Sequence, residues 1–115
     1  MKYDKDLPTP SHCMADFSLI PIGTSKESFA EEISDVVSMA KNSGLEVNVH
    51  EVGTAIEGPW DQVSQFIGQA HTMLHRHGTG RIQTDLRITT RMDKEQTMHE
   101  PVERVEKLMS QSSGD

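Results

Sequence analysis

The order of two kinds of hydrophobic spacing along the chain constrains the fold more than any other feature. Two segments have apolar residues at helical spacing, and each lies between segments in which apolar and polar residues alternate as in a β-strand. The expected elements, in chain order, are a strand at Cys13–Ile22, a helix at Phe29–Ser43, strands at Leu45–Val52 and Ala55–Gly58, a helix at Pro59–His75 and a strand at Arg81–Thr90. This β-α-β-β-α-β order predicts an α+β, ferredoxin-like fold, in which two helices cover one face of an antiparallel sheet.

Turn and cap signals support these boundaries. Ser28 and Glu31 have the spacing of a capping box at the start of the first helix. Gly44 stands where that helix is expected to end. Gly53 and Thr54 predict a tight turn that joins the two middle strands into a hairpin.

The length of 115 residues predicts a single domain with polar tails. Residues 1–12 are expected to form a disordered N-terminal tail, residues 13–110 the domain, and residues 111–115 a second polar tail. A shorter apolar stripe predicts a C-terminal helix within the domain, with its apolar residues at Val102, Val105 and Leu108 or Met109.

Charge and composition exclude several classes of function. The net charge of −7, without a basic cluster, argues against a nucleic-acid partner, because phosphate neutralisation supplies most of that affinity. Cys13 stands alone, so a disulfide framework is excluded and a reducing compartment is favoured. No apolar run approaches the ~18 residues of a membrane span. The polar start of the chain does not resemble a signal peptide, so we expect a cytoplasmic protein with no membrane partner.

Strand alternation collects polar residues on the sheet face that two helices would leave uncovered. The residues assigned to this face are Met14, Asp16, Ser18, Ile20 and Ile22 on the first strand, Asn48 and His50 on the second, and Gln83, Asp85 and Arg87 on the last. An apolar face with a few polar groups is typical of a ligand pocket or a subunit interface. The apolar fraction of 34% is low for a single isolated core, which also favours a homo-oligomer.

Glu57 and Asp16 are the carboxylates of most interest. Glu57 lies at the end of a short apolar strand, between Thr54-Ala55-Ile56 and Gly58-Pro59, and either points to water or accepts hydrogen bonds from a ligand. Aspartate is disfavoured within strands, so Asp16 is expected to have a partner. That partner is either a ligand or an arginine across the sheet, Arg87 or Arg91.

The remaining reactive residues have ordinary explanations. His71 and His75 stand four residues apart on the second helix, a spacing that can bind zinc. His71 flanks the apolar stripe beside Ile67 and Leu74, and His75 lies near the C-terminus of the helix, where positive charge is favourable. These places explain the two histidines better than a metal does, so we expect no metal site. Cys13 lacks an identifiable base and is taken as structural. His50 is the histidine best placed to line the open face.

Three segments together resemble the small YkoF-related thiamine-binding family. They are Ala15-Asp16 through Gly23-Thr24, Gly53-Thr54 through Trp60-Asp61, and Thr84-Asp85-Leu86-Arg87-Ile88 with Arg91 and Asp93. The resemblance implies a ferredoxin-like fold, dimers that pair into tetramers, and a site for thiamine or hydroxymethylpyrimidine near the sheet face, without enzymatic activity or a cofactor.

These observations leave three hypotheses. In the leading one the chain binds thiamine or its precursor. Glu57 receives the aminopyrimidine, and Ser18 and Thr54 supply hydrogen bonds. Asp16 either stabilises the cationic thiazolium or organises the pocket, and His50 lines the pocket. The second is an enzyme that uses its open face for acid–base chemistry, with Asp16, His50, Asp85 and Arg87 as the reacting residues. The third is a regulatory subunit whose open face binds only protein.

Overall fold

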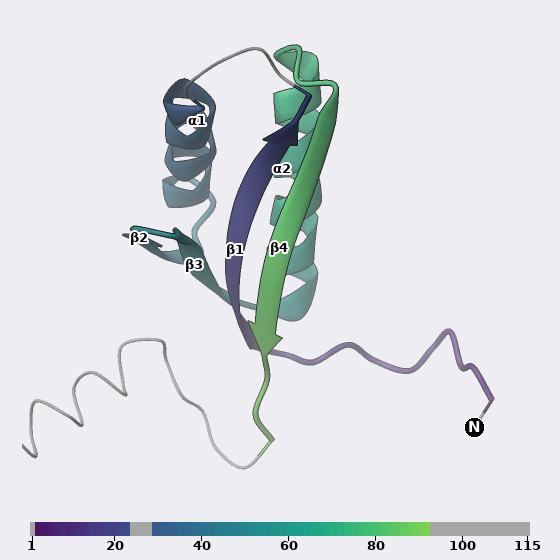
Figure 1. Cartoon of the computed structure of the whole chain (residues 1–115). Helices are drawn as coiled ribbons and strands as arrows, with labels where there is room; N and C mark the ends of the chain where they lie inside the picture. The colour runs from purple at the N-terminus through teal and green to yellow at the C-terminus, as the bar shows by residue number, and fades with distance from the viewer. Residues whose placement is uncertain (1, 24–28, 93–115) are drawn as a thin grey trace, which may run out of the picture.

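The computed structural model of the chain, which describes residues 2–23 and 29–92, has the expected order of elements (Figure 1). The strands are β1 (Cys13–Ile22), β2 (Glu46–His50), β3 (Gly53–Gly58) and β4 (Arg81–Thr89), and the helices are α1 (Ala30–Lys41) and α2 (Trp60–Arg76). The four strands form one antiparallel sheet in the order β2-β3-β1-β4. The predicted α+β, ferredoxin-like fold is confirmed. The expected C-terminal helix and tail lie outside the described residues.

Both helices pack on the same side of the sheet, and the core lies between the two layers. Figure 1 views the sheet from its open side, with α2 behind β1 and β4. The buried core residues are Cys13, Ala15, Phe17, Leu19 and Ile56 from the sheet, Val36 and Ala40 from α1, and Val63, Phe66, Ala70 and Leu74 from α2. The rings of Phe17 and Phe66 meet at a centroid distance of 6.2 Å. Burying an aromatic side chain of this kind contributes on the order of 3 kcal/mol to stability.

The strand register places the predicted polar residues on one face. Asp16 of β1 pairs with Ala55 of β3 and with Arg87 of β4. Ser18 pairs with Asp85. Because paired residues of neighbouring strands point to the same face, the polar sets of β1 and β4 coincide as expected. Asn48 of β2 pairs with Ala55 and joins the same face.

The hairpin turn differs from the prediction. His50 pairs with Gly53, so the turn is formed by Glu51 and Val52, and Gly53 is the first residue of β3. A Cβ atom at Gly53 would lie 2.6 Å from the carbonyl oxygen of Phe17 and 2.9 Å from Oγ of Ser18. The glycine is therefore needed for a close approach of β3 to β1, and its prediction as a turn residue was wrong.

The start of α1 also differs. The N-cap residue is Phe29, which makes no side-chain cap bond. Ser28 lies outside the described residues. After the helix, Gly44 has a φ of +84°, a left-handed conformation that suits glycine and ends the helical turn as expected.

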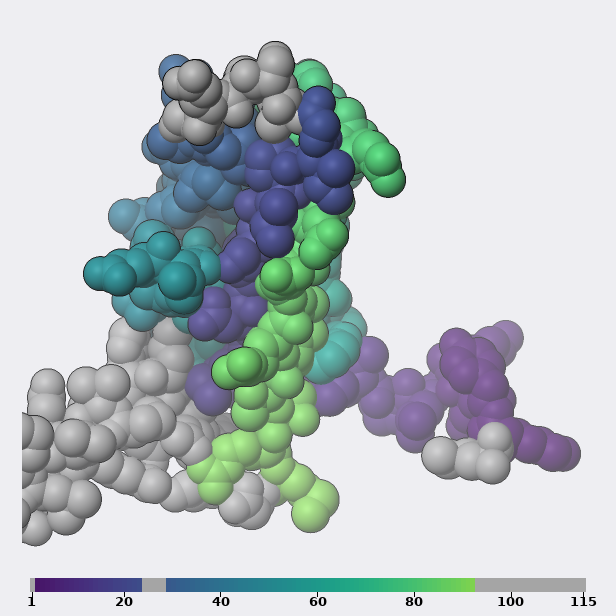
Figure 2. Space-filling view, in the orientation of Figure 1, coloured from purple at the N-terminus to yellow at the C-terminus, as the bar shows by residue number. Residues whose placement is uncertain are grey.

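The open face of the sheet is hollowed over β1. Figure 2 shows β1 between β4 on one side and the projecting β2–β3 hairpin on the other. Residues 2–12 form neither helix nor strand, are exposed, and lead away from the start of β1 (Figure 1). Among the described residues, no helix has the length and apolar character needed to cross a membrane.

Candidate ligand site on the open sheet face

An open depression on the sheet face brings together most of the polar residues expected there. Its volume is about 390 Å³, within the roughly 300–1,000 Å³ of small-molecule pockets. It is lined by Asp16, Ser18, His50, Val52, Asp85, Leu86 and Arg87. The central strand supplies the floor, and the hairpin and β4 supply the walls.

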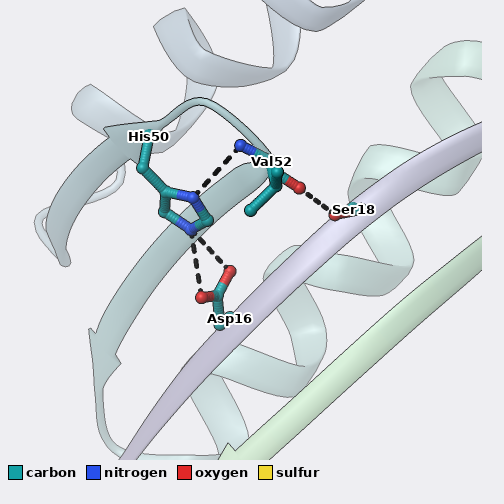
Figure 3. A network of polar contacts seen from close by, with 4 residues as sticks. All are labelled: Asp16, Ser18, His50 and Val52. Carbon is teal, nitrogen blue, oxygen red and sulfur yellow. Dashed lines mark hydrogen bonds and ion pairs between the residues drawn. The ribbon is translucent and has the colours of Figure 1, made fainter.

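A hydrogen-bond network joins the hairpin to the central strand (Figure 3). Nε2 of His50 lies 2.8 Å from Oδ1 and 3.0 Å from Oδ2 of Asp16. The backbone N–H of Val52 donates to Nδ1 of His50 at 3.3 Å. The Ser18 hydroxyl donates to the carbonyl oxygen of Val52. The hairpin tip is thus attached to β1 at two side chains, Asp16 and Ser18.

The network assigns the tautomer of His50. Because Nδ1 accepts a hydrogen bond from the Val52 amide, it carries no proton, and the ring proton of a neutral imidazole is on Nε2. That N–H then donates to the Asp16 carboxylate. Both ring nitrogens are therefore occupied by protein groups, and the histidine holds the carboxylate in place.

Asp16 keeps capacity to bind a ligand. Its side chain is 49% exposed, and a carboxylate has more lone pairs than the single His50 donor uses. Arg87 lies opposite Asp16 in the register, but the two form no ion pair in the described part of the chain. The aspartate's protein partner is thus His50, and the expected pairing with Arg87 is not observed.

Glu57 lies on the same face but outside the depression. It pairs with Met14 of β1, two residues from Asp16, and is therefore a diagonal neighbour of Asp16 on the open face. Its side chain is only 4% exposed, so the alternative of a carboxylate pointing to water does not hold. Oε2 of Glu57 lies 3.3 Å from Nε2 of His12.

Thr54 lies on the opposite side of the sheet. It pairs with Phe17, whose side chain belongs to the core, and it is buried with 5% exposure. Thr54 instead lines a second cavity of about 210 Å³ between α1 and the hairpin. Ser18, His50 and Val52 line both cavities, so their hydrogen bonds form the wall between them.

The histidines of α2 have protein partners. Nε2 of His71 contacts the Thr84 hydroxyl, and Nδ1 of His75 lies 2.8 Å from the Thr79 carbonyl oxygen. Within residues 2–23 and 29–92, no group of three or more histidine, cysteine, aspartate or glutamate side chains is arranged to hold a metal ion. Cys13 is buried, and desolvation by burial raises the pKa of its thiol.

Two contacts of the site were absent from the sequence analysis. His12 was assigned to the N-terminal tail, although extending the alternation of β1 backwards by one residue pair places it on the face of Met14 and Asp16. Val52 contributes only backbone groups, so its side-chain type carries no signal for this role.

The sequence is similar to one protein family and to several individual proteins. A family described as thiamine-binding protein matches residues 15–106. A UPF0045 protein of Eremothecium gossypii is 40% identical over 99 residues, which cover 86% of this chain and 94% of the relative. A UPF0045 protein of Synechocystis is 32% identical over 99 residues, which cover 86% of this chain and 81% of the relative.

Solved structures share the fold. A hypothetical protein from Methanocaldococcus jannaschii has a TM-score of 0.73 and 25% identity, covering 83% of this chain and 96% of its own. A Thermotoga maritima protein, provisionally assigned to thiamine biosynthesis or salvage, has a TM-score of 0.70 and 16% identity. That match covers 82% of this chain and 98% of the Thermotoga chain.

Proposed function

The chain belongs to the thiamine-binding protein family, and from that premise we propose that it binds thiamine or its hydroxymethylpyrimidine moiety without catalysis. The site is the open face of the sheet. The observation that carries this proposal is the pair of carboxylates on that face, Glu57 buried and Asp16 half-exposed, as diagonal neighbours across β3 and β1.

The spacing of the two carboxylates suits a ligand with two heterocycles. Diagonal neighbours on adjacent antiparallel strands are separated by about 7–8 Å between Cα atoms. In the proposed complex, the Glu57 carboxylate accepts hydrogen bonds from the exocyclic amine and from the protonated ring nitrogen of the aminopyrimidine. This pairing is charge-assisted. Asp16, in the depression, faces the cationic thiazolium. The net charge of −7 also favours a cationic ligand.

Ser18, His50 and Thr54, the other residues predicted to bind the ligand, have different roles in this proposal. The Ser18 hydroxyl donates to Val52 and retains lone pairs that can accept from a ligand in the depression. His50 is a positioning residue, because it fixes the orientation of Asp16. Thr54 faces the helices, so in this proposal it shapes the second cavity and does not contact the ligand on the open face.

The geometry favours binding over the enzymatic alternative. A general base at His50 needs a free ring nitrogen, and both nitrogens have protein partners. A nucleophile at Ser18 needs a base that accepts its proton, but the hydroxyl donates to a backbone carbonyl. Asp85 and Arg87 line the depression as charged groups that discriminate between ligands.

We further propose that copies of the chain pair through the open face, as homodimers that assemble into tetramers. Ile20 and Ile22 are exposed there, although large apolar side chains usually find cover. A standard interface removes about 1,600 Å² from water. Light scattering at micromolar concentration is expected to return a multiple of the 12.8 kDa chain mass. A monomer mass would contradict this assembly and favour an isolated ligand-binding domain.

Calorimetry tests the function directly. We expect titration with thiamine and with hydroxymethylpyrimidine to give saturable binding to the folded protein. Incubation of the complex should return both ligands chemically unchanged, as judged by mass spectrometry. Absence of binding by either compound would contradict the proposal. Conversion of either compound would instead support the enzymatic alternative, and pull-down of a protein without ligand binding would support the regulatory one.

A further inference from the structure

His12 lies where the proposed ligand must bind. It precedes β1, whose first pairing joins Cys13 to Gly58. Side chains alternate along a strand, so His12 faces the same side as Met14, and Met14 pairs with Glu57. The imidazole therefore reaches the Glu57 carboxylate across the diagonal, with 3.3 Å between Nε2 and Oε2.

The same arm makes a second contact with the junction of β3 and α2. The Thr9 hydroxyl donates to Oδ1 of Asp61, in the first turn of α2, at 2.8 Å. Residues 2–10 also form a hollow against Trp60. The arm is thus attached at the β3–α2 junction, which directly follows Glu57 in the chain, and this attachment keeps the imidazole close to the carboxylate.

The burial of the two partners is unequal. Glu57 is 4% exposed, whereas the His12 side chain is 46% exposed. A buried carboxylate without a hydrogen-bond donor is energetically costly. In the absence of ligand, the His12 imidazole, a flat nitrogen heterocycle of the protein itself, supplies that donor to Glu57. The aminopyrimidine in the proposed complex is also a flat nitrogen heterocycle that offers hydrogen-bond donors.

From these contacts we infer that His12 is a built-in competitor: its imidazole occupies Glu57 in the free protein and is displaced when ligand binds. This inference rests on the proposed function, in which Glu57 receives the pyrimidine. The apparent dissociation constant equals the intrinsic one divided by the fraction of molecules with Glu57 free. The arm therefore weakens binding without touching the ligand.

Removal of the imidazole tests this inference. We expect His12→Ala to tighten thiamine binding by about three- to tenfold, the factor that corresponds to one net hydrogen bond. His77→Ala is the matched control, because His77 is an exposed histidine at the end of α2, beside Asp35 and away from the open face. The affinity of His77→Ala for thiamine should equal that of the parent chain. Deletion of residues 1–11, which retains His12 but removes the Thr9 tether, should change affinity in the same direction by a smaller factor.

The outcomes separate this inference from the proposed function. If the parent chain binds thiamine and His12→Ala binds equally or more weakly, His12 is not a competitor, and the inference alone is wrong. If neither chain binds thiamine or hydroxymethylpyrimidine, both are wrong. A second readout is the NMR signal of the His12 ring, which should shift on addition of ligand to the parent chain while that of His77 does not. An unchanged His12 signal in a saturated complex would also overturn the inference.

Discussion

His50 and Asp16 connect the tip of the β2–β3 hairpin to the central strand, with 2.8 Å between Nε2 and Oδ1. The two residues are 34 positions apart in the sequence, and only the antiparallel register brings them together. The contact fixes a half-exposed carboxylate on the floor of the depression. It therefore couples the position of the hairpin to the site.

Substitution of His50 tests this coupling. His50→Ala should lower the free energy of unfolding by about 0.5–1.5 kcal/mol, the net value of one hydrogen bond. It should also weaken thiamine binding by roughly three- to tenfold, because Asp16 loses its fixed orientation. Asn48→Ala is the matched control on the same strand and face, and urea unfolding with calorimetry provides the measurements. Unchanged affinity in a destabilised His50→Ala chain would show that the pair is structural only.

Gly53 provides a sharper structural prediction. A Cβ at this position meets a backbone carbonyl of Phe17, which cannot rotate away, and the Ser18 hydroxyl of the network. Gly53→Ala should therefore destabilise the chain by about 1–3 kcal/mol and disturb the hairpin. Gly68→Ala is the control: nothing lies within 4 Å of its Cβ, and alanine is favoured within a helix such as α2. Thermal unfolding should show opposite shifts for the two variants.

Much of the fold follows from local patterns in the sequence. Phe17 and Leu19 must point to the core, and this requirement places Asp16 and Ser18 on the other face without knowledge of the partner strands. Helical spacing likewise orients α2 through Val63, Phe66 and Ala70. These choices depend on residues close in sequence, so they could be predicted.

The contacts of the site depend on register and could not be predicted in the same way. Glycine suits both a turn and a close approach, and the sequence around Gly53 does not distinguish these roles. Because the turn was predicted at Gly53 and Thr54, the prediction did not place Thr54 on either face of the sheet. In the structure Thr54 lies on the face covered by the helices. The pairing of His12 with Glu57 spans 45 positions, and although the alternation of β1 places His12 on the open face, it does not show which residue His12 meets there.

Cys13 gives a prediction about pH. Burial raises the pKa of its thiol in the folded chain, so the folded state holds this proton more tightly than the unfolded state. At neutral pH the thiol is protonated in both the folded and the unfolded state, so this group does not reduce the free energy of unfolding there. That free energy falls as the pH rises past the unfolded thiol value of about 8.5 towards the folded value.

Two measurements test the state of Cys13. Native protein should react with a thiol reagent far more slowly than protein unfolded in urea, because the thiol is buried. In Cys13→Ala, the decline in unfolding free energy above about pH 8.5 should be shallower than in the parent chain. Equal labelling rates in the native and unfolded chains would show that the start of β1 is open to solvent.

Glu57 carries the proposed ligand site. Glu57→Gln is nearly isosteric and keeps an acceptor oxygen, so packing against Met14 and the neighbouring strands should change little. It removes the charge, and a hydrogen bond to a charged group contributes about 1.5–3 kcal/mol. Affinity for thiamine and for hydroxymethylpyrimidine should therefore fall by roughly ten- to a hundredfold.

Calorimetry on folded protein of matched oligomeric state is the measurement, and Glu31→Gln, on the exposed surface of α1, is the charge-matched control. If Glu57→Gln binds as tightly as Glu31→Gln, Glu57 is not the pyrimidine acceptor, and Asp16, with its half-exposed carboxylate in the depression, becomes the residue to substitute next.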